Sequence, residues 1–208
     1  MPAPLIGLGL LLPVLTVSTL KSDGVDFDYL PLEPLQARHV GGPPSLALSI
    51  KAGASEPFLR LSYDRSASTM AEDEYRLRRF GATLGYRAGF PVTDGVQVGP
   101  EAWAGYTTAK GLSTVHTLST VAEVEGTGRE AQAGLGGFVG YLPAPWLHVG
   151  ARGGLSVAYG QAEGEFRPAV DPLAWVEMNE PFAWTRTGWE VGLEATWLLP
   201  VDDTARSE

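Results

Sequence analysis

Residues 147–160 read LHVGARGGLSVAYG, and this stretch decides the fold. Its odd positions are apolar apart from one glycine and end in an aromatic residue, whereas its even positions carry glycine, small residues and charge. The odd positions are Leu147, Val149, Ala151, Gly153, Leu155, Val157 and Tyr159. Alternation with a period of two over this length predicts a long β-strand with two unlike faces.

Glycine indicates which face of such strands points inward. Along the chain, glycines of the predicted strands fall on the polar faces, as Gly85, Gly105 and Gly134 do, and Gly137 and Gly153 are the exceptions. A solvated strand face favours larger polar residues, because glycine weakens a strand and packs nothing. The crowded interior of a small barrel accommodates glycine. The pattern therefore favours a membrane barrel with lipid outside, and the alternative is a soluble ligand-binding barrel that hides its apolar face.

Composition limits the classes of protein. The chain has 208 residues, no cysteine, 44% hydrophobic residues and a net charge of −9. This predicts one domain without disulfides or thiolate metal sites, and the negative charge argues against a nucleic-acid partner. No apolar run approaches the roughly 20 residues of a membrane helix. A closed barrel is the remaining way to satisfy a backbone inside a bilayer.

The same alternation predicts seven strands. They are Ser45–Gly53, Phe58–Asp64, Arg79–Phe90, Val96–Thr107, Ala131–Tyr141, Leu147–Gly160 and Gly188–Leu199. Their connections alternate between short turns (54–57, 91–95, 142–146) and long loops (65–78, 108–130, 161–187). Outer-membrane barrels have short periplasmic turns and long outer loops. The last strand then ends in the periplasm, and one more strand must precede Ser45.

Two interpretations compete for the segment that supplies this first strand. Leu5–Thr16 is apolar on both faces and has the character of the apolar region of an export signal, but it has no positive segment before it. If residues 1–20 are such a signal, the missing strand must come from Val25–Val40. If they are the first strand, seven plus one gives eight strands. We prefer the second: an all-β, antiparallel up-and-down transmembrane β-barrel over residues 1–200, with a short tail, 201–208, and both termini in the periplasm.

Aromatic residues cluster near the ends of the predicted strands. Phe90, Tyr141, Trp146 and Trp197 fall at the short-turn end, and Tyr106, Tyr159 and Trp189 fall toward the long loops. Amphipathic rings settle at both lipid–water boundaries. We expect these residues to form two aromatic girdles, although packing in an ordinary core is the alternative.

The inward faces carry many charges. They are Lys51, Arg60, Asp64, Arg79, Arg87, Glu101, His148, Arg152, Glu190 and Glu194. Buried charges must be paired, so we expect Arg87 to pair with Glu101, and Arg152 with Glu194 or Glu190. These pairs form either a structural plug or a lining that selects ions. Trp103 and Phe138 also point inward, which favours the plug.

The final strand carries a family resemblance. Residues 190–197, EVGLEATW, loosely resemble the C-terminal assembly signal of bacterial outer-membrane barrels, but they lie before the C-terminus and not at it. The chain as a whole resembles the small eight-stranded outer-membrane barrels of the protein A, protein X and opacity-type group. The resemblance implies a closed, narrow barrel with a structural, adhesive or narrow-pore role.

Enzymatic chemistry is not expected. Some small barrels modify lipid A with a Ser–His pair or a histidine near the outer leaflet, but His148 falls at the periplasmic end. His39 and His116 fall in predicted loops without a serine motif beside them. The glycines near Gly134 lie inside a strand and lack the spacing of a nucleotide-binding loop. We predict no catalytic, metal or cofactor site.

The long loops are acidic, which fits either a solvated surface or divalent-cation bridging to lipopolysaccharide. The last loop also holds the apolar residues Phe166, Trp175, Met178 and Phe182, which fit either packing on the barrel or a protein partner. We therefore expect a non-catalytic outer-membrane protein with a structural or surface-interaction role. Outer-membrane lipid, lipopolysaccharide and a protein at the extracellular loops are its expected partners. The alternatives are a narrow pore for ions or small solutes and an outer-leaflet lipid-modifying enzyme.

Overall fold

The computed structural model describes residues 4–22, 44–70, 73–116, 121–168, 176–177 and 182–200. The strands are β1 (Leu5–Ser22), β2 (Ser45–Lys51), β3 (Ser55–Met70), β4 (Asp73–Ala88), β5 (Phe90–Thr93), β6 (Val96–His116), β7 (Val121–Ala144), β8 (Leu147–Pro168), β9 (Val176–Glu177) and β10 (Phe182–Pro200). Within this part of the chain, no helix is long and apolar enough to cross a membrane.

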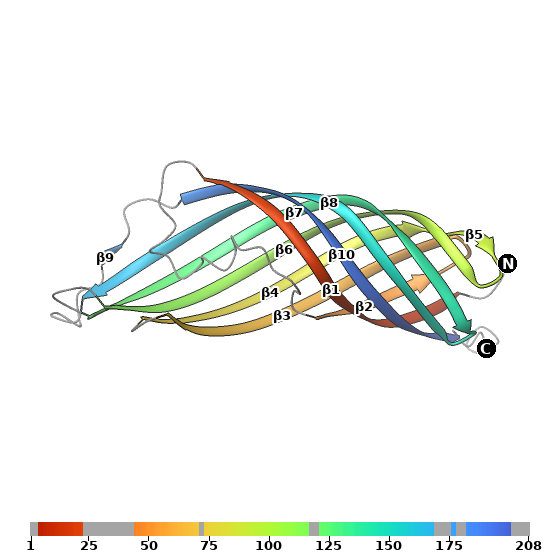
Figure 1. The fold of residues 1–208 in the computed structure, drawn as a ribbon, viewed down its shortest axis with the longest axis horizontal. Helices are drawn as coiled ribbons and strands as arrows, with labels where there is room; N and C mark the ends of the chain where they lie inside the picture. The colour runs from red at the N-terminus through yellow and green to blue at the C-terminus, as the bar shows by residue number, and fades with distance from the viewer. Residues whose placement is uncertain are drawn as a thin grey trace, which may run out of the picture.

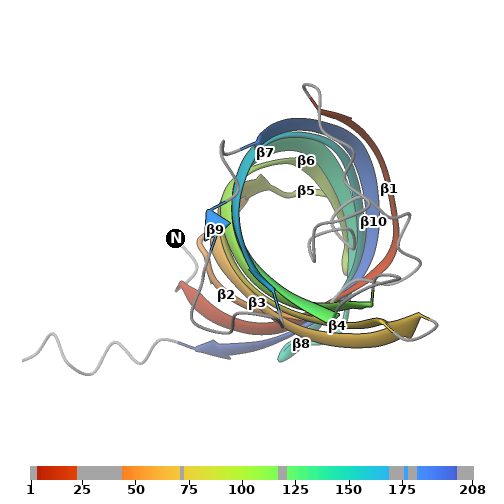
Figure 2. The same ribbon diagram turned by 90° about the vertical axis from the view of Figure 1, so that its left-hand side faces the viewer.

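Eight of the described strands close into one antiparallel barrel, seen from the side in Figure 1 and along its length in Figure 2. Neighbours follow the order β1, β2, β3, β4, β6, β7, β8, β10, and β10 then pairs with β1. β5 continues β4 after Gly89 and pairs with β6, and β9 adds two residues beside β8. The eight-stranded up-and-down barrel predicted from the sequence is confirmed.

The two faces of the barrel have opposite character. Leu84, Leu135 and Leu155 point outward and are 66%, 71% and 69% exposed. Alternate positions point inward, where Arg87 and Glu101 are buried. This arrangement is the reverse of a soluble ligand-binding barrel, whose apolar face lies inside. The unequal faces read from residues 147–160 therefore have the orientation expected of a wall that contacts lipid.

The apolar segment near the N-terminus is strand β1 in this structure. It pairs with β10 on one side and β2 on the other, so that Leu5 lies opposite both Pro200 and Lys51. Its register against β10 shifts between Pro13 and Leu15. Proline cannot donate to the ladder, so a local irregularity is a position at which a strand tolerates it. The alternative first-strand segment, 25–40, and the tail, 201–208, lie outside the described residues.

The strands extend much further than predicted, and this corrects the expected long loops. β3 runs on to Met70, β4 begins at Asp73, β6 reaches His116, β7 begins at Val121 and β8 reaches Pro168. Most of the residues expected in loops 65–78, 108–130 and 161–187 are therefore paired. Of the apolar residues in the last expected loop, Phe166 and Phe182 belong to β8 and β10, whereas Trp175 and Met178 lie outside the described residues.

The outward residues of the strand extensions explain why the hydrophobic pattern did not predict these extensions. Beyond Phe80, the outward positions of β4 are Arg78 and Arg76, and beyond Tyr106 the outward position Lys110 of β6 is also charged. The backbone ladder continues, with Arg78 opposite Lys110. The strand persists while its outer face changes from apolar to charged, so the alternation of apolar and polar residues ends before the strand does.

The short turns lie together at the other end of the barrel. Ala52 and Ser55 exchange backbone hydrogen bonds of 2.8 and 3.1 Å around Gly53, whose φ is +63°. Glycine adopts this left-handed conformation without steric cost. The predicted strand Ser45–Gly53 therefore ends at Lys51, because Gly53 turns the chain into β3.

Candidate functional site: the charged lumen

Inward positions of five strands place a cluster of charges inside the barrel. Arg60 comes from β3, Arg87 from β4, Glu101 from β6, Arg152 from β8 and Glu194 from β10. All five residues are buried. Because alternate residues of a strand face the same side, the period-two pattern alone directs these side chains into the lumen.

Arg87 and Glu101 lie directly opposite each other in the β4–β6 register. Arg87 Nη2 lies 3.0 Å from Glu101 Oε2, and Arg87 Nε donates to the same oxygen at 3.2 Å. The pair expected from the sequence is present in the structure.

Glu194 has a different partner from the one expected. Arg87 donates to it from Nη1 to Oε1 at 3.0 Å and from Nη2 to Oε2 at 2.8 Å. Thr196 Oγ1 donates to Glu194 Oε1 at 3.1 Å. β4 and β10 are on opposite sides of the eight-strand cycle. The lumen is narrow enough for side chains to meet across it, whereas the predicted pairs join adjacent strands.

Arg152 pairs with two carboxylates, those of Glu190 and Glu101. Its Nη2 forms an ion pair with Glu190, and its Nε lies 3.2 Å from Glu101 Oε1. Of the two partners expected for Arg152, Glu190 is therefore the one that the structure shows. No ion pair between Arg152 and Glu194 occurs among the described residues. Glu101 is shared by three arginines, since Arg60 Nη2 also lies 3.1 Å from its Oε1.

Aromatic rings flank the arginines. The guanidinium carbon of Arg60 lies 3.9 Å from the centre of the Phe58 ring, that of Arg87 lies 4.5 Å from Phe138, and that of Arg152 lies 4.8 Å from Trp103. These distances are in the range of cation–π contacts. Trp103 and Phe138 point inward, as the sequence predicted.

Glycine makes room for these rings. A Cβ atom at Gly85 would overlap the Phe58 ring, and one at Gly134 or Gly154 would overlap the Trp103 ring. The inward glycines therefore occupy positions where no side chain fits beside the aromatic residues.

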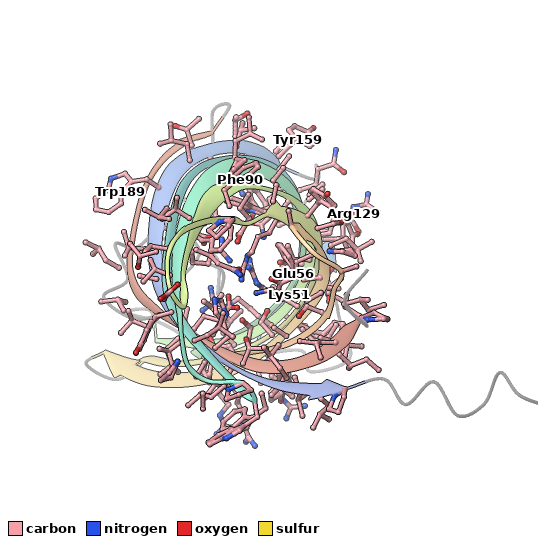
Figure 3. All side chains as sticks on the ribbon, turned by 90° about the vertical axis from the view of Figure 1, so that its right-hand side faces the viewer. Lys51, Glu56, Phe90, Arg129, Tyr159 and Trp189 are labelled. Atoms are coloured by element: carbon pink, nitrogen blue, oxygen red, sulfur yellow. The ribbon has the colours of Figure 1, made fainter. Side chains whose placement is uncertain are left out.

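Glu56 is a further lumen residue that was not predicted, because the sequence at 54–57 indicates a turn. Glu56 is buried on β3 directly opposite Arg87 in the β3–β4 register, and its Oε1 lies 3.7 Å from Arg87 Nη1. Figure 3 shows Glu56 and Lys51 pointing into the barrel. The signal was present, because Glu56 continues the inward alternation of Phe58 and Arg60 by one step.

Two further groups of inward charges occupy the end with the long strands. Arg79 Nη2 lies 2.5 Å from Asp64 Oδ2, so these two predicted residues pair with each other and not with the main cluster. In the second group, Glu130 accepts hydrogen bonds from Trp184 Nε1 at 3.0 Å and from Arg186 Nε at 3.1 Å. Glu130, Trp184 and Arg186 fall within the predicted loops 108–130 and 161–187, so this group was not predicted.

At the short-turn end, Lys51 Nζ donates to Gln97 Oε1 at 2.7 Å. His148 is buried nearby on the inward face of β8, and its Nε2 has no hydrogen-bond partner among the described residues. In this part of the chain, no group of three or more His, Asp and Glu side chains is placed to hold a metal ion.

The aromatic residues expected in girdles all lie on the outer wall. They are Phe90, Tyr106, Tyr141, Trp146, Tyr159, Trp189 and Trp197, and each is at least 40% exposed. Figure 3 shows Tyr159 and Trp189 projecting away from the barrel. Their exposure is consistent with girdles and excludes packing in a core.

The structure of a major outer membrane protein from Thermus thermophilus matches the barrel with a TM-score of 0.57 and 12% sequence identity, over 95% of this chain and 100% of that chain. The chain has the fold of an outer-membrane β-barrel. No protein-family model and no curated protein matches its sequence.

Other solved structures resemble this outer-membrane barrel more distantly. Ail, the attachment invasion locus protein of Yersinia pestis, has a TM-score of 0.40 at 15% identity, with 96% of this chain and 100% of Ail covered. The outer membrane protease OmpT from Escherichia coli has a TM-score of 0.34 at 8% identity, with 94% and 97% covered. At 12% identity, the likeness to the Thermus thermophilus protein shows the fold and not the activity.

Proposed function

We propose that this outer-membrane barrel is a non-catalytic protein of a bacterial outer membrane, with a closed lumen and a structural or surface-interaction role. The contact between Arg87 and Glu194 carries the proposal, because it joins opposite walls inside the barrel. A side-chain bridge across the lumen leaves little space for a solute at that level. This supports the plug over the ion-selective lining.

Burial and pairing of the neighbouring charges support the same conclusion. Arg60, Arg87 and Arg152 contact the carboxylates of Glu56, Glu101, Glu190 and Glu194 in one connected cluster. Ion-selective linings need charged groups that a passing ion can reach. Here the arginines are occupied by carboxylates and covered by aromatic rings.

The orientation in this proposal follows from the two unlike ends of the barrel. The short turns and the residues Leu5 and Pro200 share one end, which we assign to the periplasm. The long strand extensions then project outward from the membrane. Their charged outer faces and the loops that join them are the surface available to outer-leaflet lipid, lipopolysaccharide and protein partners.

Conductance in a planar lipid bilayer tests the closed lumen. We expect no channel steps from the refolded wild-type protein. Arg87→Ala combined with Glu194→Ala should raise conductance, because it removes the bridge, and Thr127→Ala on the outer wall is the matched control that should stay silent. Regular channel steps from the wild type would contradict the closed lumen. Altered lipid structures in cells expressing the protein would contradict a non-catalytic role.

A further inference from the structure

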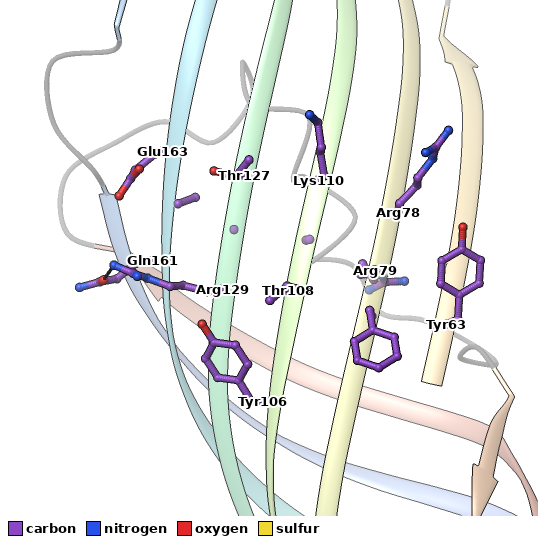
Figure 4. Close-up of a pocket in the computed structure, with 14 residues that line it drawn as sticks. Tyr63, Arg78, Arg79, Tyr106, Thr108, Lys110, Thr127, Arg129, Gln161 and Glu163 are labelled. Carbon is purple, nitrogen blue, oxygen red and sulfur yellow. Dashed lines mark hydrogen bonds between the residues drawn. The ribbon is translucent and has the colours of Figure 1, made fainter. Parts of the chain in front are cut away.

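Three basic side chains lie next to one another on the outer wall. Arg65 on β3 is directly opposite Arg78 on β4, and Arg78 is directly opposite Lys110 on β6. All three are exposed on the outward face, and we call them the cation row. Figure 4 shows Arg78 and Lys110 extending beyond the level of Tyr63 and Tyr106.

This arrangement is electrostatically unfavourable by itself. Residues directly opposite in an antiparallel pair have Cβ atoms about 4.5–5.5 Å apart, and like charges there destabilise the pair. Lys110 forms an ion pair with Glu125. Among the described residues, neither Arg65 nor Arg78 has an ion-pair partner, so Arg78 lies between two cations without a carboxylate. An external anion would relieve the repulsion.

The level of the cation row along the barrel axis indicates where it lies relative to a lipid bilayer. Arg65 follows the exposed Tyr63 by two residues, and Arg78 precedes the exposed Phe80 by two. Two strand residues span about 6.7 Å, or about 5 Å along the axis of a barrel with strands tilted near 40°. If the rings lie at the edge of the hydrocarbon, this offset places the cations in the headgroup layer, which is about 5–7 Å thick on each side.

A hollow of about 440 Å³ lies beneath these cations. Tyr63, Phe80 and Tyr106 line it together with Arg78 and Lys110. Aromatic rings and cations therefore share one site, as the chain and the headgroup of a lipid require. On its other side, Arg129 Nη2 donates to Gln161 Oε1 at 3.0 Å, and Gln161 Nε2 donates to the Tyr159 hydroxyl at 3.1 Å.

The outward-facing cations of the described strands lie at one end of the barrel. The protein has a net charge of −9, and its short turns at 52–54, 94–95 and 145–146 contain no lysine or arginine. The local excess of positive charge is thus a property of the long-strand end of this wall. Glu163 is the acidic residue that lines the hollow, and Thr127 separates it from Lys110 in the register.

We propose that the cation row and the hollow beneath it bind the phosphate of an anionic lipid headgroup in the leaflet at the long-strand end of the barrel. The phosphate would lie between Arg78 and Lys110, and the upper part of the acyl chains would contact Tyr63, Phe80 and Tyr106. This inference rests on the proposed membrane location, but it does not depend on whether the lumen is closed.

Native mass spectrometry of the full chain tests the proposal. The protein is refolded in detergent with equal amounts of phosphatidylglycerol and phosphatidylcholine of the same acyl chains, and the retained lipids are counted. We expect the wild type to prefer phosphatidylglycerol. Arg78→Gln with Lys110→Gln should reduce that preference about fivefold for each cation removed, the equivalent of about 1 kcal/mol each. Glu163→Gln, which removes the opposite charge from the same hollow, should maintain or increase it.

The alternatives give different results. An unchanged lipid preference in the double variant would overturn the proposal. Glycerol phosphate that binds the lipid-free protein and displaces phosphatidylglycerol would identify a free phosphate ligand and would also overturn it. If the double variant fails to fold, Arg78→Gln alone and the loss of the wild-type preference at high salt replace it, because exposed charges are screened by salt. Retention of neither lipid by the wild type would instead contradict the proposed membrane location.

Discussion

Arg87 on β4 holds Glu194 on β10 through two hydrogen bonds, of 3.0 and 2.8 Å, that cross the inside of the barrel. The same guanidinium contacts Glu101 on β6 and Glu56 on β3. One side chain thereby connects four strands. We expect the stability of the barrel to depend on Arg87 more than on any of its carboxylate partners alone.

Glu194→Ala should destabilise the barrel by about 3–5 kcal/mol, because it leaves Arg87 buried with fewer carboxylates. The double variant with Arg87→Ala and Glu194→Ala should lose less stability than the sum of the losses in the two single variants. Urea unfolding in lipid vesicles measures all three variants. Arg152→Ala combined with Glu194→Ala is the comparison, since these residues do not contact each other directly, and it should be closer to additive. Equal coupling in both cycles would contradict the assigned contacts.

Gly134→Ala should destabilise the barrel by about 1–3 kcal/mol, because the added methyl group would overlap the Trp103 ring in the lumen. Gly137→Ala is the matched control on the same strand. Gly137 faces outward, and the nearest atom to an added Cβ is 3.4 Å away. The control should change stability by no more than about 0.5 kcal/mol. Unfolding midpoints that shift equally for both variants would show that the lumen has room around Trp103.

Leu155→Arg should impair membrane insertion much more than Glu163→Arg. Both residues point outward from β8, but Leu155 is 69% exposed within the apolar band and Glu163 lies beyond Tyr159. Arginine costs about 2–4 kcal/mol at the membrane midplane and about 0–1 kcal/mol near its interface. The yield of folded protein in vesicles, read from the shift between unboiled and boiled gel samples, measures the difference. Similar yields for the two variants would show that Leu155 does not lie within an apolar band that contacts lipid.

The absence of native cysteine allows the orientation to be tested directly. Glu163→Cys should react with a membrane-impermeant maleimide in intact cells, because we assign the long-strand end to the cell exterior. Asp94→Cys, which is in a short turn and also exposed, should react only after the outer membrane is opened. The reverse labelling pattern would invert the proposed topology.

Alternation of residue types was sufficient to predict the fold. In Leu147–Gly160 the outward and inward residues differ so clearly that both the strand and its orientation follow, and Arg87 opposite Glu101 follows from the short turn between β4 and β6. The prediction stopped at Arg79 and Thr107, where the outward residues cease to be apolar. A strand that leaves the bilayer keeps its hydrogen bonds but loses its hydrophobic face, so the pattern cannot report its true end.

The contacts across the lumen were less accessible to sequence reasoning. Register relates a residue to its neighbours on adjacent strands, which is why Arg87–Glu101 could be predicted. Glu194 meets Arg87 because of the diameter and shear of the closed barrel, and these depend on all eight strands at once. The cation row was also missed, because Arg65 and Arg78 were assigned to a loop, where their register against each other has no meaning.

The seam between β1 and β10 has a consequence for how the chain folds. β1 pairs with β10 from Leu5↔Pro200 to Ser22↔Trp184, so the pairing with the greatest sequence separation is also among the longest in the molecule. An unclosed sheet would present two rows of unpaired amides and carbonyls to hydrocarbon. A partly folded chain in which β10 has not yet paired with β1 therefore has no stable form within a bilayer. Closure must come last and bring the whole wall into register together, so that insertion behaves as a single slow, cooperative step dominated by non-local contacts.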